Sequence, residues 1–146
     1  MNAASILAQK QKGREVVTAA PETALTDAAR MLDEHKIGAL VITGAGGELR
    51  GVVSERDIAR AIARHGAAAL DQSVDHIMTS KVVTAAPNDT IDVMMGCMTE
   101  RRIRHLPVLE QGRLVGLVSI GDIVKAKIEA AEAENEAIKT YITSGV

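Results

Sequence analysis

The sequence predicts an α+β protein made of two β-α-β-β-α motifs that pack as a pseudo-twofold pair, with an extra helix at each end. The first observation is an internal repeat, because Val-Val-Thr-Ala-Ala-Pro occupies residues 16–21 and again residues 82–87. The second is that short β-branched runs alternate with stretches of helical periodicity in both copies. Two copies are too few for a solenoid, which indicates a pair that shares a core.

Further matches occur along the chain at the same spacing, so the six-residue identity is not a chance match. At the same spacing, Glu34 matches Glu100, and Leu40 matches Leu106. One residue is lost in a loop, and Gly-Val-Val-Ser at 51–54 then matches Gly-Leu-Val-Ser at 116–119.

Each copy predicts the same elements in the same order. A Val-Val-Thr strand is ended by a proline and followed by a helix, whose apolar residues recur at helical spacing and whose N-caps are predicted at Thr23 and Asp89. Two strands joined by a glycine-containing turn come next, and a second helix opens at Ser54 or Ser119. The predicted helical stripes are Leu25, Ala28, Ala29 and Leu32, then Ile91, Met94, Met95 and Met98; the strand pairs are 39–42 with 51–53 and 106–109 with 116–118.

Three segments lie outside the copies. A short helix is predicted over residues 5–12 and stopped by Gly13, and a helical piece at 74–78 lies in the linker. The tail predicts one long helix whose apolar seam steps alternately by four and three residues, with Asn135 as its polar member, so it either self-associates or packs back on the body. The predicted divisions are 1–13, 14–66, 67–79, 80–127 and 128–146, and the seam is Val124, Ile128, Ala131, Asn135, Ile138 and Ile142.

Composition limits the function classes. The formal net charge is −2, with no Phe, no Trp and one Tyr, which argues against a basic nucleic-acid coat and against base stacking on aromatic side chains. One Cys excludes an intrachain disulfide, and the four His residues lack metal-ligand spacing, so no metal site is expected. No apolar run suits a membrane helix and no secretory signal is recognised, so we expect a cytoplasmic protein.

The repeated motifs resemble a tandem of cystathionine-β-synthase (CBS) domains, also called a Bateman module. The resemblance rests on the two Val-Val-Thr-x-x-Pro starts, the two Gly-x-Val-Ser-x-x-Asp-Ile segments, Ile-Met-Thr at 77–79 and Arg-His-Leu-Pro-Val at 104–108. It covers about residues 14–127, and the chain is similar to stand-alone bacterial members. The resemblance implies a regulatory protein that binds AMP, ADP, ATP, S-adenosylmethionine or NAD(H) between the copies, with AMP the first candidate. It also implies dimerisation into a disc and an effector protein elsewhere.

The Ser-x-x-Asp segments at 54–57 and 119–122 carry two interpretations. One is a capping box, in which Ser and Asp each satisfy a backbone N–H at the helix start. The other is ribose binding, because a carboxylate offers two acceptors to two adjacent hydroxyls, while the helix start presents free N–H groups to phosphate. Recurrence after the same strand in both copies favours ribose binding in at least one of them.

A basic cluster at 101–105 distinguishes the second copy, because the first has His-Lys-Ile-Gly-Ala at the equivalent place. Solvated surface charge is the simple interpretation of Arg101 and Arg102. Strand alternation puts Arg104 and His105 on opposite faces, so at least one of them faces a cleft and is a candidate to bind phosphate.

The family pattern implies two nucleotide sites, each taking its Asp from one copy and its adenine-facing strands from the other. Site 1 has more cations and is expected to take the phosphorylated ligand, although the charge of Glu55 would oppose phosphate unless it points to solvent. Site 1 comprises Ser54, Arg56, Asp57, Val82, Val83, Thr84, Ile103, Arg104, His105 and Pro107; site 2 comprises Val17, Thr18, Ile37, Gly38, Ala39, Ser119, Gly121 and Asp122.

No catalytic function is expected, because no nucleophile–base pair and no paired carboxylates are recognisable. Cys97 lies beside the Met94, Met95 and Met98 stripe and is interpreted as a small buried hydrophobe, and the Gly-Ala-Gly-Gly at 44–47 is interpreted as a hairpin turn and not as a phosphate loop. Two alternatives stay open: an interaction scaffold with vestigial clefts, and a nucleic-acid binder that uses the patch at 101–105.

Overall fold

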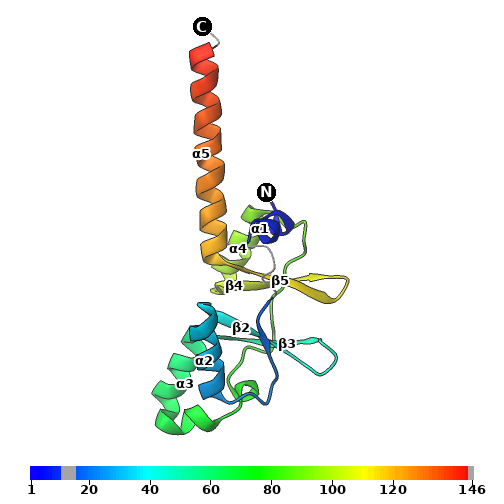
Figure 1. Ribbon diagram of the computed structural model, residues 1–146, viewed down its shortest axis with the longest axis vertical. Coiled ribbons are helices and arrows are strands. Elements are labelled where there is room, and N and C mark those ends of the chain that lie inside the picture. The colour runs from blue at the N-terminus through cyan, green and yellow to red at the C-terminus, as the bar shows by residue number, and fades with distance from the viewer. Residues whose placement is uncertain (11–15, 145–146) are drawn as a thin grey trace.

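The structure, a computed structural model that describes residues 1–10 and 16–144, has two small mixed lobes and one long helix that extends away from them (Figure 1). The first lobe holds a three-stranded sheet in the order β1-β2-β3, and the second holds the β4-β5 hairpin. The elements are α1 (Ala3–Gln9), β1 (Thr18–Ala19), α2 (Leu25–His35), β2 (Ala39–Thr43), β3 (Leu49–Ser54), α3 (Glu55–His65), the 3₁₀ helices η1 (Gly66–Asp71) and η2 (Val74–His76), α4 (Ile91–Arg101), β4 (His105–Glu110), β5 (Arg113–Ser119) and α5 (Ile120–Ser144).

Each lobe has its own aliphatic core, as the predicted stripes require. Leu25, Ala28 and Leu32 of α2 are buried against β2 and β3. Met94 and Met98 of α4 are buried against β4, β5 and the start of α5, where Ile123 is fully buried. The predicted pair of β-α-β-β-α motifs is therefore confirmed.

Backbone hydrogen bonds repeat between the lobes at the spacing of the sequence repeat. The amide of Ala85 donates to the carbonyl of Pro107, and Ala85 and Val108 form an isolated parallel bridge, which corresponds to the pairing of Ala19 with Ile42. The left-handed residues Lys36 (φ 54°) and Arg102 (φ 55°) end α2 and α4 in the same way. The amide of Glu55 donates to Gly38, and that of Ile120 to Arg104, so both second helices start from equivalent contacts.

Several local predictions were wrong. The strand predicted at 82–84 does not form. Residues 82–84 pair with no strand, and only Ala85 makes a bridge to β4. Ala24, and not Thr23, is the N-cap of α2, and it makes no side-chain cap bond. Thr90 caps α4 by accepting from the Val93 amide, while Asp89 accepts from the Ala86 amide in the preceding turn.

The linker before the second motif and helix α1 each pack on a glycine, and the two glycines lie at equivalent places in the lobes. A Cβ on Gly51 would lie 2.5 Å from Met78 Sδ in the linker, and a Cβ on Gly116 would lie 2.5 Å from Leu7 of α1. The linker therefore packs on the first lobe and α1 on the second. The linker piece predicted at 74–78 is the 3₁₀ helix η2. The helix predicted over residues 5–12 is α1, which begins two residues earlier and ends at Gln9, with Lys10 as its C-cap; Gly13, predicted to stop it, lies outside the described residues.

The long tail helix is confirmed, but most of its length does not pack back on the body. Ile123 and Ala126 are buried where α5 leaves the second lobe, whereas Val124 and Ile128 are half exposed. Beyond them the helix stands clear of both lobes (Figure 1).

Candidate functional site

A cleft of about 470 Å³ lies between the two motifs and is lined by both of them. The first motif contributes the end of β3 and the start of α3, and the second contributes the α4–β4 turn and the β5–α5 junction. The linker also lines the cleft at Thr79, whose amide donates to the carbonyl of Val52 and whose carbonyl accepts from the Val52 amide. The lining residues are Gly38, Val52, Ser54, Glu55, Arg56, Asp57, Arg60, Thr79, Lys81, Val82, Val83, Arg102, Ile103, Arg104, His105, Ser119, Ile120 and Gly121.

The lining combines aliphatic walls with an excess of positive charge. Val82, Val83 and Ile103 supply half-buried apolar surface. Five lining side chains are Lys or Arg, against the two carboxylates of Glu55 and Asp57. Because two helices also begin at this cleft, their free N–H groups add partial positive charge. The cleft therefore suits an anion attached to a flat apolar group.

Asp57 forms the capping box that the sequence allowed and still lines the cleft. Its Oδ2 accepts from the Ser54 amide at 2.8 Å and from the Ser54 hydroxyl at 3.0 Å, while Ser54 Oγ accepts from the Asp57 amide at 3.2 Å. Its Oδ1 lies 3.5 Å from Arg60 Nη1. A carboxylate has about four acceptor positions, so the cap leaves acceptor capacity on Asp57 for a ligand hydroxyl.

Glu55 and His105 approach each other beside Gly38. A Cβ on Gly38 would lie 3.3 Å from His105 Nε2 and 3.6 Å from Glu55 Oε1, so glycine keeps this corner open. Burial lowers the pKa of His105 from 6.5, and this outweighs the opposing carboxylates of Glu55 and Asp122. The imidazole is therefore neutral near pH 7, able to donate one hydrogen bond and accept another. Glu55 lines the cleft, so its charge lowers the positive potential there.

The structure brings most of predicted site 1 into this one cleft. Eight of its ten residues line it; Thr84 is exposed outside the lining, and Pro107 is buried in β4. Both Arg104 and His105 line it, as their assignment to site 1 requires. Sequence reasoning missed Arg60, Lys81 and Thr79 as lining residues and assigned Arg102 to the surface. Of these, only Arg60 could have been predicted from the sequence, because it lies three residues after Asp57 and therefore on the same face of α3.

Predicted site 2 is divided by the fold. Gly38, Ser119 and Gly121 line the same cleft as site 1, whereas the other five residues lie outside its lining: Val17, Thr18, Ile37, Ala39 and Asp122. Asp122 Oδ2 accepts from the Ser119 amide at 2.9 Å, and the Asp122 amide donates to Ser119 Oγ at 3.1 Å.

Lys10 pairs with the carboxylate of site 2. Its Nζ donates to Asp122 Oδ2 at 2.9 Å and to the carbonyl of Leu117 at 2.8 Å. Burial raises the pKa of Asp122, but the Ser119 amide and the Lys10 ammonium outweigh it and lower the pKa below 3.8. Lys10 and the Ser119 amide therefore take the acceptor positions of Asp122 Oδ2, and nothing in the sequence spacing indicated the contact with Lys10.

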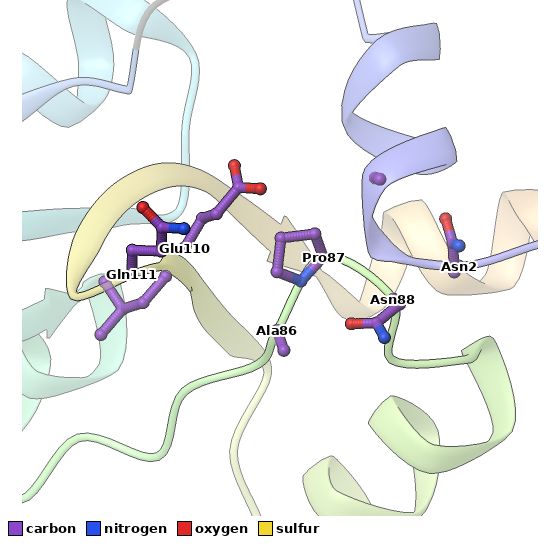
Figure 2. Close-up of a pocket in the computed structure, with 8 residues that line it drawn as sticks. Asn2, Ala86, Pro87, Asn88, Glu110 and Gln111 are labelled. Atoms are coloured by element: carbon purple, nitrogen blue, oxygen red, sulfur yellow. The ribbon is translucent and has the colours of Figure 1, made fainter.

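Other features carry less chemistry. Figure 2 shows a second pocket, where Asn2 lies across from Pro87 and Asn88 in the loop before α4, with Glu110 at the end of β4 and Gln111 in the following turn on the other side of Pro87. In the described residues no group of three or more His, Cys, Asp or Glu could hold a metal ion. Among the same residues, no helix is both long and apolar enough to span a membrane. Cys97 is half-buried against the second core.

Comparisons with known proteins agree with this architecture. The CBS domain family model matches residues 13–64 and 74–129. The CBS-domain containing protein ATU1752 from Agrobacterium tumefaciens has a structure that superposes with a TM-score of 0.82 and 48% identity, covering 86% of this chain and 92% of that one. The mitochondrial CBS domain-containing protein CBSX3 of Arabidopsis thaliana is 36% identical over 82% of this chain, which spans 60% of that protein's length.

Two similar structures were solved with adenosine compounds. PAE2072 from Pyrobaculum aerophilum, complexed with AMP, has a TM-score of 0.73 and 29% identity, covering 84% of this chain and 89% of that one. The CBS domain pair of protein MJ0100, complexed with 5′-methylthioadenosine and S-adenosylmethionine, has a TM-score of 0.78 and 27% identity, covering 89% and 98%.

Proposed function

The chain belongs to the CBS domain family, with two copies in tandem, and from this premise we propose that its inter-motif cleft binds an adenosine nucleotide, AMP first, as a non-catalytic regulatory site. The observation that carries the proposal is the pairing of aliphatic walls with five cationic side chains in one cleft that also holds Asp57. The adenosine ligands of the two similar structures support it. ADP, ATP and NAD(H) are the further candidates.

Each part of the nucleotide has a partner of matching chemistry. The adenine lies between the aliphatic side chains of Val83 and Ile103, since none of the described residues that line the cleft is Phe, Trp or Tyr. The ribose hydroxyls donate to Asp57, and the phosphate receives the Arg104 guanidinium, which binds phosphate bidentately. Lys81 supplies a further point charge.

A ligand in this position bridges elements of both motifs. Asp57 belongs to the first motif and Arg104 to the second, so binding adds contacts between lobes that have separate cores. The ligand then favours the inter-lobe arrangement for which its affinity is higher, and only by that difference in affinity. An effector protein that distinguishes the arrangements would receive the signal.

Isothermal calorimetry with AMP, ADP, ATP, NAD and adenosine tests the proposal. We expect saturable AMP binding with one site per chain, because the five cationic side chains and Asp57 line the same cleft. In the same assay, Asp57→Asn weakens AMP and adenosine alike, by about tenfold for one charge-assisted hydrogen bond. Asp27→Asn is the matched control, because Asp27 is exposed on α2 and outside the cleft.

Two results would contradict the proposal. The first is flat titrations with every nucleotide, which would favour the scaffold alternative. The second comes from mass spectrometry of small molecules released from the purified protein: an adenosine compound that co-purifies in the same amount with the wild type and with Asp57→Asn would not be held by Asp57.

A further inference from the structure

The exposed part of α5 carries a seam that is apolar except for Asn135, and nothing in the described chain covers it. Its large members are half exposed or more, at 49% for Val124, 53% for Ile128, 50% for Ile138 and 60% for Ile142. The lobe contacts the other side of the helix through Ile123 and Ala126, both buried. A narrow seam of this spacing, alternating four and three residues, is the pattern that two helices bury against each other.

We propose that α5 pairs with α5 of a second copy of this chain as a short parallel two-stranded coiled coil. In the heptad notation, Ile128, Asn135 and Ile142 take the a positions, and Val124, Ala131 and Ile138 take the d positions. An Asn at a single a position selects the parallel, in-register dimer, because its side chain pairs with the same Asn of the second helix. This association surface is separate from the nucleotide cleft.

The charges beside the seam complement each other in the parallel arrangement. Lys127 at g faces Glu132 at e of the second copy, and Glu134 at g faces Lys139 at e, so each flank carries opposite charges. All four side chains are exposed. Within its own chain Lys127 also lies 2.9 Å from Asp92 Oδ1, and Lys139 lies 4.0 Å from Glu136 Oε1, both at the surface.

The antiparallel alternative buries the same apolar residues but brings like charges together. With Ile128 opposite Ile138 of the second copy, each Glu132 faces the other Glu132 and each Glu134 faces the other Glu134. It also places Asn135 against Ala131, where the amide has no partner in the apolar layer. The sequence of α5 therefore favours the parallel direction over the antiparallel one for pairing with a second copy.

Sedimentation equilibrium of the full chain is the first test. Ile138→Asp is expected to halve the mass of the wild-type assembly and weaken association on the order of tenfold or more, because it puts a charge in the seam. Ala137→Asp adds the same charge on the outer face and should leave the mass unchanged, with circular dichroism confirming equal helix content. A monomeric wild type, or equal masses for all three proteins, overturns the proposal.

Disulfide trapping tests the direction. In a Cys97→Ser background, Ile138→Cys should form an interchain disulfide under mild oxidation and Ala137→Cys should not, because position 138 meets its own copy only in the parallel dimer. Failure of Ile138→Cys to cross-link, or equal cross-linking at 137, overturns the parallel arrangement. As a second readout, Glu134→Lys should weaken dimerisation about fivefold, and adding Lys139→Glu should restore it; no restoration contradicts the charge pairing.

Discussion

Arg104 separates phosphate recognition from adenosine recognition in the proposed site. It lines the cleft from the turn before β4, and its own carbonyl anchors the first amide of α5. Arg104→Ala is expected to weaken AMP binding about tenfold, because a charge-assisted contact is lost, while the affinity for adenosine stays the same. Calorimetry with both ligands measures the difference.

Arg101 provides the control for this prediction. It is exposed at the end of α4, three residues away, and does not line the cleft. Arg101→Ala should therefore leave both affinities unchanged. If Arg104→Ala reduced AMP and adenosine binding equally, its role would be to support the fold and not to hold phosphate.

Asp122 should make the protein sensitive to acid through its contact with Lys10. The folded state holds the pKa of Asp122 below 3.8, so the stabilisation is fully present above that value and is lost as the pH falls through the lower folded pKa. Lys10→Met removes one of the causes and should raise the Asp122 pKa towards 3.8. Carboxyl NMR titration measures it directly, and an unchanged pKa in Lys10→Met would contradict the contact.

At the scale of elements, the linker and α1 occupy equivalent places because glycines leave room for them. On Gly51 a Cβ would lie 2.5 Å from Met78 Sδ and 2.8 Å from the carbonyl oxygen of Thr79. Gly51→Ala should therefore destabilise the protein by about 1–3 kcal/mol, the usual cost of overpacking. Because Thr79 lines the cleft, AMP affinity should also fall.

Gly96→Ala is the matched control for Gly51→Ala, and it is expected to raise stability instead of lowering it. Gly96 lies inside α4 with nothing within 4 Å of an added Cβ, so Gly96→Ala should stabilise the protein by about 0.5–1 kcal/mol through helix propensity. Thermal melts followed by circular dichroism compare the two variants. Equal melting temperatures for Gly51→Ala and the wild type would mean that the linker does not approach β3 this closely.

The internal repeat predicted the elements well because each one depends on local pattern and on burial of its own apolar face. It predicted less where tertiary contacts decide. Val-Val-Thr at 82–84 has strong β propensity, yet only Ala85 pairs with β4. Lys81 and Lys10 were missed because their roles depend on where the linker and α1 dock, and the repeated residues do not record this.

For the whole molecule, the cleft differs in charge from the rest of the chain. The formal net charge is −2, while five Lys or Arg side chains line the cleft against two carboxylates. Nucleotide binding at this place should therefore depend on a local positive field and not on the overall charge. Salt screens such a field, with a Debye length of about 10 Å at 0.1 M ionic strength and about 3 Å at 1 M.

This predicts a graded salt dependence among ligands that share the adenosine group. Raising the ionic strength from about 0.1 M towards 1 M should weaken ATP binding most, AMP less and adenosine least, because the screened attraction grows with ligand charge. Calorimetric titrations at several salt concentrations give the three slopes, with Arg102→Ala expected to reduce the slope for ATP. Equal slopes for the three ligands would show that the cationic lining does not face the phosphates, and the assignment of Arg104 and Lys81 would fail with it.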